Sequence, residues 1–388
     1  MKIVFDRDEM INAVSPMLGV VSNKSTIAAL ECVLIETKED GSCTLCGYDS
    51  EKGVRNTIKA DISESGSMLI NAGKFISILR TMPDGGIAVE TNDRGLMKIY
   101  RGLSSFELHV LPGSDFPVLP DLDGVNGFSL PQKELKSMLS RISYAVATKD
   151  VRPELNGAYF VIRGNKITVV GCDSNCLALR ERTCEIEYIE GSEALPEEIK
   201  FILPTRSMLE LMKLAKDSDE KISVMMGRKH VIFNFGEMKF FSRVIDSEYI
   251  DYERFIPKNS TMTVKIGCDA LLRSLERASL ITEDSSLGQT KSPLRCHFSE
   301  DVLQLSSVSV SGRFSEEIPI DMNEGDLDIG FNCRYFIDAL RAVDRERIKL
   351  SLTSSLISMI IEQDETAEDY DENDRFLYLV VPVRMRNN

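Results

Sequence analysis

The chain has 388 residues, of which 43% are hydrophobic and 28% are charged. These proportions are typical of globular proteins, and the length predicts two or three domains rather than one. No run of 18 uncharged apolar residues occurs, so the sequence predicts no membrane-spanning helix. The N-terminal segment lacks the apolar stretch of a signal peptide, which favours a cytoplasmic protein.

The formal net charge is −15, from 46 basic and 61 acidic residues. Taken alone, this acidity argues against a nucleic-acid partner, because contacts to phosphate need basic surfaces. The nine cysteines are expected to be reduced thiols, since no export signal precedes them. Cys43 and Cys46 have the spacing of half a zinc site, but no second pair follows, which favours a structural role. The sequence therefore predicts no metal and no cofactor.

Two helical patterns recur along the chain, and each occurs three times. Apolar residues at helical spacing predict helices over 5–21, 70–82, 130–146, 203–216, 266–282 and 331–343. Pro16 is expected to kink or split the first of them. The second pattern aligns over 70–80, 203–213 and 331–341, and each copy ends on a basic residue, namely Arg80, Lys213 or Arg341.

Short runs with strand character lie between these helices, and turn residues separate the runs. Examples are 31–36, 158–162, 166–170, 231–235 and 302–305. Turn-rich stretches at 111–127 and 251–259 are expected to be linkers. The sequence thus predicts an α+β protein of three repeated domains, each with antiparallel sheets and two helices, over 1–125, 126–251 and 252–388.

Basic residues concentrate in the predicted helices, which together hold 13 basic and 8 acidic residues. One interpretation is a surface, built from equivalent helices of each repeat, that faces a polyanion through its phosphates without sequence preference. The alternative is that these are ordinary charged helix faces. In contrast, 362–374 contains eight acidic residues and no basic one, which predicts a solvated loop between the last two strands.

Motifs for catalysis are absent from the sequence. It contains no phosphate-binding glycine loop, no nucleophile elbow and no zinc-binding helix motif. The acidic pairs Asp121/Asp123 and Asp326/Asp328 lie in polar turns and are expected to be solvated. The chain is therefore not predicted to be an enzyme. A nuclease whose carboxylates converge only on folding, and an interaction module that never touches DNA, remain as alternatives.

Four segments resemble one family in order and spacing: 115–120 (DFPVLP), 147–157 (ATKDVRPELNG), 329–332 (IGFN) and 378–385 (YLVVPVRM). Over essentially its full length the chain resembles the β sliding clamp of bacterial DNA polymerase III. The resemblance implies a non-catalytic processivity factor, in which two chains of three clamp domains join head to tail as a ring dimer. Helices would line the hole around double-stranded DNA and sheets would form the outside. Partners would be the replicative polymerase, the clamp loader and repair polymerases.

The resemblance also implies residues for three sites. DNA-facing candidates are Lys24, Arg80, Lys149, Arg152 and Arg206, and the helix argument adds Lys74, Lys136, Arg141, Lys213, Arg273 and Arg341. Any of these residues is otherwise an ordinary surface cation. The contact between the two chains is implied for Phe106 and Leu108 against Leu280 and Ile281.

The third implied site is a pocket between the second and third domains for a short apolar peptide shared by partner proteins. Carried over by position, it comprises Leu155, Cys172, Ser174, Asn175, Cys176, Leu177, Ile250, Arg254, Phe255, Asn332, Tyr335, Leu356, Ser358, Val380, Val381, Pro382, Val383, Arg384 and Met385. The segment 172–177 reads CDSNCL, where the family often has Thr-Asp-Gly-His-Arg-Leu. The proline common in the family at the position of Ile250 is also absent. These differences predict an altered peptide preference.

Overall fold

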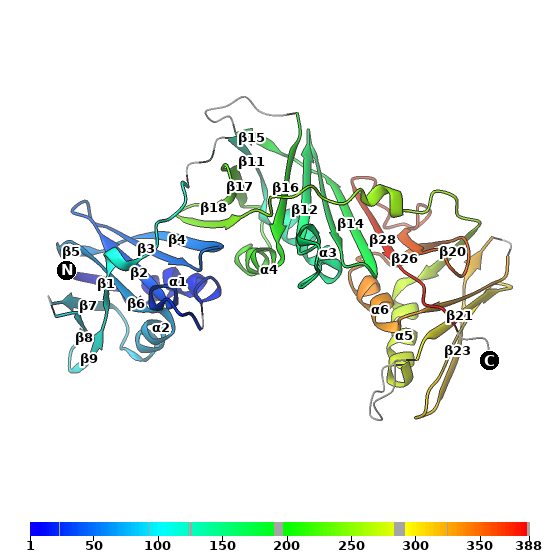
Figure 1. Ribbon diagram of the computed structural model, residues 1–388, viewed down its shortest axis with the longest axis horizontal. Coiled ribbons are helices and arrows are strands. Elements are labelled where there is room, and N and C mark those ends of the chain that lie inside the picture. Colours follow the sequence, from blue (N-terminus) through cyan, green and yellow to red (C-terminus); the bar gives the residue numbers. More distant parts are fainter. Residues whose placement is uncertain are drawn as a thin grey trace. The chain divides into compact units, whose positions relative to one another are not determined.

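The computed structural model describes residues 1–22, 24–92, 94–122, 124, 126–189, 197–282, 292–323 and 325–385. The chain forms two compact units (Figure 1). Unit 1 consists of Met1–Lys133, Ile186–Pro196 and Leu209–Val244, and unit 2 consists of Glu134–Glu185, Glu197–Met208 and Ile245–Asn388. Each unit contains two sheets, and the strand pairs within them are antiparallel, as predicted.

Unit 1 has a five-stranded sheet in the order β5-β1-β7-β8-β9. Its strands are β1 (Lys2–Asp6), β5 (Asp61–Glu64), β7 (Gly86–Thr91), β8 (Leu96–Arg101) and β9 (Ser104–His109). The second sheet has ten strands in the order β10-β6-β2-β3-β4-β19-β18-β17-β11-β15. These are β2 (Cys32–Thr37), β3 (Ser42–Tyr48), β4 (Lys52–Lys59), β6 (Gly66–Asn71), β10 (Leu111–Pro112), β11 (Asn126–Pro131), β15 (Glu187–Ile189), β17 (Lys221–Met226), β18 (His230–Phe235) and β19 (Met238–Arg243).

Unit 2 has a nine-stranded sheet in the order β16-β12-β13-β14-β28-β27-β26-β20-β24. Its strands are β12 (Gly157–Arg163), β13 (Lys166–Cys172), β14 (Cys176–Thr183), β16 (Ile199–Pro204), β20 (Met262–Gly267), β24 (Asp321–Met322), β26 (Arg347–Leu352), β27 (Met359–Gln363) and β28 (Asp374–Val380). A four-stranded sheet has the order β23-β22-β21-β25. It is built from β21 (Leu294–Ser299), β22 (Val302–Val308), β23 (Arg313–Pro319) and β25 (Leu327–Phe331).

All six predicted helices are present in the described part of the chain. They are α1 (Arg7–Val14), α2 (Ala72–Thr81), α3 (Gln132–Ile142), α4 (Thr205–Leu214), α5 (Cys268–Thr282) and α6 (Cys333–Arg341). The first is split as predicted, because α1 ends at Val14 and a 3-10 turn with Pro16 in its first turn follows. The repeated helices α2 and α6 begin alike. The side-chain oxygens of Asn71 and Asn332 accept hydrogen bonds from first-turn amides at 3.0 and 3.1 Å.

Two strand pairs carry the large sheets across the boundaries between sequence repeats. In unit 1, β4 pairs with β19, and Val54 lies opposite Phe240. In unit 2, β14 pairs with β28 over seven residue pairs, from Cys176 opposite Val380 to Arg182 opposite Asp374. The middle repeat therefore contributes strands to both units. The domain boundaries at 125/126 and 251/252 follow the sequence repeats and stay a prediction.

The predicted linkers cover the sheets where these strand pairs occur. In unit 1, Phe116, Leu119 and Leu122 pack against a cluster that includes buried Phe241. Asp123 and Val125, which the sequence also places in this linker, lie outside the described residues. In unit 2, the second linker and the residues before it supply Tyr249, Tyr252 and Ile256, which pack on a buried cluster formed by Val170, Leu177, Leu179, Ile360, Leu377 and Leu379. Below, this set of six is called the junction cluster.

A buried ionic network joins β14 to β28 and to the end of α6. The Arg180 side chain is only 1% exposed and pairs with Asp344 at 2.8 Å and with Asp374. Asp374 also pairs with Arg345 at 3.0 Å and with Arg182 at 3.1 Å. Buried charges are tolerated when each has such partners, whereas the loss of one partner leaves an uncompensated charge.

The network also determines how one carboxylate responds to acid. Burial alone would raise the pKa of Asp344, but Arg180 and then Arg141 and Arg345 lower it overall from the usual 3.8. A carboxylate with a lowered pKa stabilises the folded state at neutral pH. That contribution is complete above the ordinary pKa and is lost as the pH falls through the lower, folded-state pKa.

The prediction that 362–374 is a solvated loop is wrong in part. The segment does connect β27 to β28, the last two strands. However, the Asp364 side chain has no exposed surface and pairs with Lys265 at 3.0 Å and with Arg347 at 3.3 Å. Asp374 is buried in the network described above. Cations from distant parts of the chain thus neutralise two of the acidic residues.

We predict that Asp374→Ala lowers the free energy of unfolding of unit 2 by about 3–5 kcal/mol, because three arginines lose a buried partner. Urea unfolding followed by circular dichroism measures the change. Glu372→Ala is the matched control, since Glu372 is exposed in the same segment. Equal stability of the two variants would contradict the role given to the network.

Candidate functional site

Backbone pairing in unit 2 gathers several of the predicted peptide-pocket residues. Cys172 lies opposite Leu177 in the β13–β14 pair, and Cys176 lies opposite Val380 in the β14–β28 pair. After β28 the chain stays beside the residues that precede β14, where the amide of Val381 donates to the carbonyl of Asn175 at 3.0 Å. Residues from the middle and the end of the chain are therefore neighbours in the fold.

The end of the chain is held against β25 and borders a small cavity. Pro382 forms a bridge with Phe331, and the amide of Val383 donates to the carbonyl of Gly330 at 2.8 Å. A cavity of about 170 Å³ lies beside this segment, lined by Thr282, Ser292, Pro293, Asn332, Cys333, Val383 and Arg384. Three predicted pocket residues, Asn332, Val383 and Arg384, therefore border one cavity.

The turn between β13 and β14 has a fixed conformation. The Asp173 carboxylate accepts hydrogen bonds from the amides of Asn175 at 3.0 Å and Cys176 at 2.9 Å. Ser174 has a φ of 77°, in the left-handed region that L-residues other than glycine seldom adopt. Burial raises the pKa of Tyr335, and the negative charge of Asp173 raises it further.

Exposure divides the predicted pocket residues into two groups. Leu155, Cys176, Leu177 and Val380 are buried and form part of the interior. By contrast, the described surface includes Phe255 at 61%, Leu356 at 71% and Val381 at 38% exposure. Ile250 and Ser358 are half-buried. Arg254 is exposed and pairs with Asp251 at 2.6 Å.

Sequence reasoning missed three aromatic and apolar residues at this place. Tyr249, Tyr252 and Ile256 pack on the junction cluster, and the rings of Tyr249 and Tyr159 stack with centroids 4.6 Å apart. The signal was the run 249–256, in which aromatic residues recur at the start of a predicted linker and just before it. Chemically, the arrangement offers partly exposed apolar side chains over a buried cluster, which suits an apolar ligand rather than a reaction.

The predicted DNA-facing cations lie on five helices and in two loops, and they fall into two electrostatic classes. Those on α5 and α6 are compensated, because Arg273 pairs with Asp269 at 2.9 Å and Arg341 pairs with Glu276 at 2.8 Å. Lys213 pairs with Glu210 at 3.0 Å and Arg152 with Asp150 at 3.1 Å. Arg141 lies 3.7 Å from Asp344 and donates to the carbonyl of Ala342.

Within the described part of the chain, six of the predicted cations have no ion pair. They are Lys24, Lys74, Arg80, Lys136, Lys149 and Arg206. Five of the six are exposed, and Lys136 is half-buried. All six belong to the first two sequence repeats. In the third repeat, both predicted DNA-facing cations, Arg273 and Arg341, have an ion pair.

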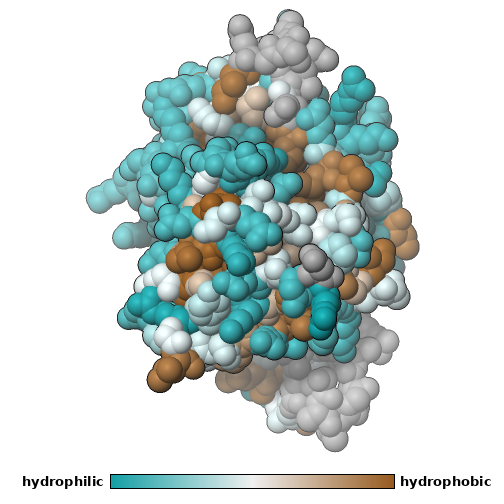
Figure 2. All heavy atoms as spheres, turned by 90° about the vertical axis from the view of Figure 1, so that its left-hand side faces the viewer, coloured by the Kyte–Doolittle hydropathy of each residue, from teal (hydrophilic) through white to brown (hydrophobic). Residues whose placement is uncertain are grey.

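Exposed apolar residues occur on an edge strand of unit 1 and on a helix that packs against an edge strand of unit 2. β9 is the last strand of its sheet in unit 1 and carries Phe106, which is 38% exposed (Figure 1). β23 is one of the two edge strands of the four-stranded sheet in unit 2 and packs against α5, which carries Leu280 at 75% exposure. Figure 2 shows several separate groups of hydrophobic side chains within a largely hydrophilic face. Exposed apolar edge strands are prone to pair with another chain.

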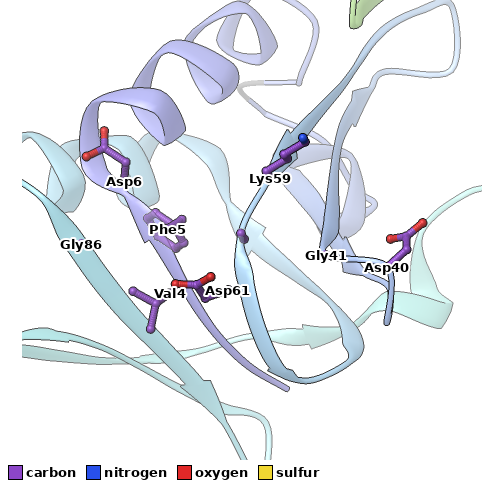
Figure 3. A pocket seen from close by; sticks show the side chains of 9 residues that line it. Val4, Phe5, Asp6, Asp40, Gly41, Lys59, Asp61 and Gly86 are labelled. Atoms are coloured by element: carbon purple, nitrogen blue, oxygen red, sulfur yellow. The ribbon is translucent and has the colours of Figure 1, made fainter.

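One hollow of unit 1 brings together no reactive group of side chains among the described residues. It is an open cavity of about 490 Å³ that borders β1, and Asp6, Asp40 and Asp61 lie at separate places around it (Figure 3). Among the residues that the structure describes, no group of three or more His, Cys, Asp or Glu side chains is arranged to hold a metal ion. None of the described helices is long and apolar enough to cross a membrane.

The acidic pairs from the sequence do not form a metal site in the described residues either. Asp328 forms a two-pronged contact with Arg295, whose hydrogen bonds lower the pKa of the carboxyl. Asp326 is exposed and lies 3.9 Å from His297, a surface contact. Asp123, the partner of Asp121, lies outside the described residues. Among the residues that the structure describes, the carboxylates do not converge in the way that the nuclease alternative requires.

Comparison with known proteins decides the family. Three family models match successive parts of the chain: the N-terminal domain of the DNA polymerase III beta subunit over 1–120, its central domain over 129–251 and its C-terminal domain over 253–383. The chain belongs to the DNA polymerase III beta subunit family. Curated relatives include beta sliding clamps of Staphylococcus epidermidis and Staphylococcus aureus, each 27% identical over 394 aligned positions that cover 99% of both chains.

Solved structures of the same family have the same fold. The DNA polymerase sliding clamp of Bacillus subtilis matches with a TM-score of 0.90 at 25% identity over 100% of both chains. A DNA polymerase III beta subunit from Eubacterium rectale matches with a TM-score of 0.89 at 26% identity, over 99% of this chain and 100% of the other. The predicted family and the repeated clamp domains are confirmed.

Membership of this family settles the general function. The chain is a sliding clamp of DNA replication, a processivity factor that has no catalytic role of its own. Its partners are, in general, DNA and a DNA polymerase. The alternatives of a nuclease and of a module that never touches DNA are therefore not retained.

Proposed function

We propose that two copies of this chain join head to tail into a ring that encircles double-stranded DNA. The observation that carries this proposal is the pair of open edge strands, β9 in unit 1 and β23 in unit 2. Phe106 and Leu108 on β9 then contact Leu280 and Ile281 of the other copy. Ile281 lies beside the turn between β22 and β23. Its Cδ1 atom is 3.6 Å from the place that a side-chain Cβ would take at Gly312. Such a contact covers apolar side chains that are a liability in a single chain.

Within the ring, we propose that the unpaired cations on α2, α3 and α4 and in the neighbouring loops face the DNA. Arg80 and Arg206 are exposed and unpaired in the described part of the chain, so a phosphate meets no competing carboxylate there. The compensated Arg273 and Arg341 contribute less, because each contact with phosphate first costs an ion pair. The attraction is directed at phosphates and carries no sequence preference.

Partner proteins are proposed to bind beside the β14–β28 pair with a short apolar peptide. The replicative polymerase, the clamp loader and repair polymerases are the expected owners of such peptides. Support comes from the half-exposed Val381, whose amide donates to the carbonyl of Asn175, and from the half-buried aromatic ring of Tyr335 on α6. Apolar and aromatic side chains at the centre of an interface account for most of the binding energy of peptides of this kind.

The ring predicts a solution mass twice the 43.5 kDa of one chain. Phe106→Asp is expected to reduce the mass to that of a single chain, because the change places a charge in the apolar contact. Light scattering over a dilution series measures the solution mass of the wild type and of the variant. Val118→Asp is the control, since Val118 is 94% exposed in the first linker and away from β9. A single-chain mass of the wild type at every concentration would refute the ring.

For the DNA surface, we predict that Lys74→Glu, Arg80→Glu and Arg206→Glu together weaken DNA binding without unfolding the chain. The slope of log affinity against log salt should fall by about three, since each substitution removes one interaction with a phosphate. The control is Lys38→Glu, Lys229→Glu and Lys258→Glu, which changes the net charge equally at three exposed positions outside the helices. The proposal fails if both variants lose DNA to the same extent or if neither does.

Tyr335→Ala is expected to weaken binding of a polymerase C-terminal clamp-binding peptide by about tenfold, because the substitution removes an aromatic ring that the peptide would cover. Fluorescence anisotropy with the labelled peptide measures the affinity. Tyr370→Ala serves as the control, since Tyr370 is 43% exposed in the acidic segment after β27. Wild-type affinity of the Tyr335 variant would count against the pocket.

A further inference from the structure

Two open strand edges carry side chains of opposite charge. β9 is bordered only by β8 in its sheet, and β23 is bordered only by β22. Glu107 on β9 and Arg313 on β23 are both exposed. Within the described part of the chain, neither side chain has an ion pair. An acidic residue on one edge and a basic residue on the other are therefore available to a second copy of the chain.

The backbone of β9 determines which of its residues present hydrogen-bonding groups at the open edge. The amide of Val110 donates to the carbonyl of Gly95 at 2.9 Å, and the β8–β9 register continues from this pair without a shift. Because hydrogen bonds alternate along an antiparallel strand, the even-numbered residues of β9 bond to β8. The amides and carbonyls of the odd-numbered residues therefore point to the open edge, and these residues are Ser105, Glu107 and His109.

The open edge of β23 follows the same rule. The amide of Ser309 donates to the carbonyl of Gly312 at 2.9 Å, next to the last pair of the β22–β23 register. Even-numbered residues of β23 therefore bond to β22, and the open edge presents Arg313, Ser315 and Glu317. The named strand pairs of this chain are antiparallel. If β9 pairs in this way with β23 of another copy, odd-numbered residues must lie opposite odd-numbered residues.

An odd-to-odd pairing also joins matching faces of the two sheets. Phe106 and Leu108 lie opposite buried residues of β8, so they belong to the core side of their sheet. Phe314 and Ile318 lie opposite buried residues of β22, on the core side of theirs. Side chains alternate along each strand, so the two apolar sides become continuous. The odd-numbered polar residues then meet on the other side.

Charge separates the remaining registers, in which Glu107 faces Arg313, Ser315 or Glu317. Opposite Glu317 it meets a like charge, which destabilises a strand pair. Opposite Ser315 it has no partner of opposite charge. Opposite Arg313 it forms a cross-strand ion pair, which stabilises the pairing. Charge complementarity therefore favours the register that sets Glu107 opposite Arg313.

Packing at Phe106 favours the same register. With the ion pair in place, the ring of Phe106 lies opposite the half-buried ring of Phe314. A shift by two residues would set Phe106 opposite Glu316, whose carboxylate accepts a hydrogen bond from Arg277 at 2.9 Å. Two aromatic rings that face each other across a strand pair stabilise it, whereas an apolar ring gains little against a charged group.

Leu108 finds room in this register as well. It lies opposite Gly312, where no side chain blocks its approach. The Cδ1 atom of Ile281 is 3.6 Å from the place that a side-chain Cβ would take at Gly312. Leu108 therefore reaches Ile281, which is one of the contacts proposed for the ring. The apolar contact and the ion pair thus require the same register.

We propose that β9 of one copy pairs antiparallel with β23 of the other copy in the register that sets Glu107 opposite Arg313. The ion pair forms at both junctions of the ring, and it determines which residues of the two edges meet. A slip by two residues breaks the ion pair and separates Leu108 from Ile281. The inference specifies the contact within the proposed head-to-tail ring and rests on that ring.

A charge exchange in the full-length chain tests the ion pair. Glu107→Arg and Arg313→Glu are each expected to raise the dissociation constant of the ring by about tenfold, because attraction becomes repulsion at both junctions. The double variant restores the ion pair with its charges exchanged, so its dissociation constant should return to within about threefold of wild type. Light scattering over a dilution series measures the three constants.

Lys38→Glu and Glu39→Arg, singly and together, are the matched controls, since both residues are exposed in the turn between β2 and β3. Their dissociation constants should equal that of the wild type. If Glu107→Arg has no effect or tightens the dimer, Glu107 faces Ser315 or Glu317 and the inference is overturned. A dimeric wild type whose double variant does not recover removes the ion pair alone. A wild type that stays a single chain refutes the ring and the inference together.

A covalent cross-link tests the register independently of charge. Ser105 lies opposite Ser315 in the proposed register and opposite Glu317 after a shift by two residues. Residues directly opposite are close enough for a disulfide, whereas diagonal neighbours are too far apart. The variant with Ser105→Cys and Ser315→Cys should therefore give a dimer band on a non-reducing gel after mild oxidation, with oxidised wild type as the control. A dimer band only from Ser105→Cys with Glu317→Cys would overturn the register.

Discussion

The ladder of hydrogen bonds between β14 and β28 is the interaction on which most of unit 2 depends. It pairs seven residues of the middle repeat with seven residues near the end of the chain. Because side chains alternate along a strand, this register sends Leu177 and Leu179 into the junction cluster together with Leu377 and Leu379. The same register sets Arg180 beside Phe376, with the buried carboxylates around it. If the pairing of β14 with β28 slipped by one residue, Arg180 would face the apolar cluster. The ionic network and the apolar cluster therefore require the same pairing.

The helices were predictable because the signals that form them are local. The apolar spacing, Pro16 after α1 and the Asn caps of α2 and α6 all lie within a few residues of the elements that they define. The state of the acidic segment was not predictable on this basis. Asp364 looks solvated in sequence, yet its partners Lys265 and Arg347 come from other strands of the sheet. The burial of Arg180 was hidden for the same reason, since Asp344 and Asp374 reach it only through the fold.

In the candidate sites, too, contacts between residues close in sequence were predictable, and contacts made only by the fold were not. The pairing of Asp269 with Arg273 was visible in the sequence, because residues four apart face each other on a helix. The pairing of Arg341 with Glu276 was not, since it joins two helices. Likewise, resemblance supplied the residues of the peptide pocket, but not that Leu155, Leu177 and Val380 are interior. A position carried over from a family identifies a neighbourhood, and only packing decides which of its side chains a ligand can reach.

The charge of the chain fits a clamp better than it fits a tightly binding DNA protein. With a net charge of −15, long-range attraction to DNA is weak, and contacts must come from cations close to the phosphates. The six cations that have no ion pair in the described part of the chain are the proposed source of these contacts, whereas the carboxylates on α5 offset the arginines of α5 and α6. Tight binding would oppose movement along the duplex, because each ion pair must break at every step. In a closed ring, retention follows from topology, so a few unpaired cations suffice to centre the DNA, and an acidic surface elsewhere does not weaken the hold.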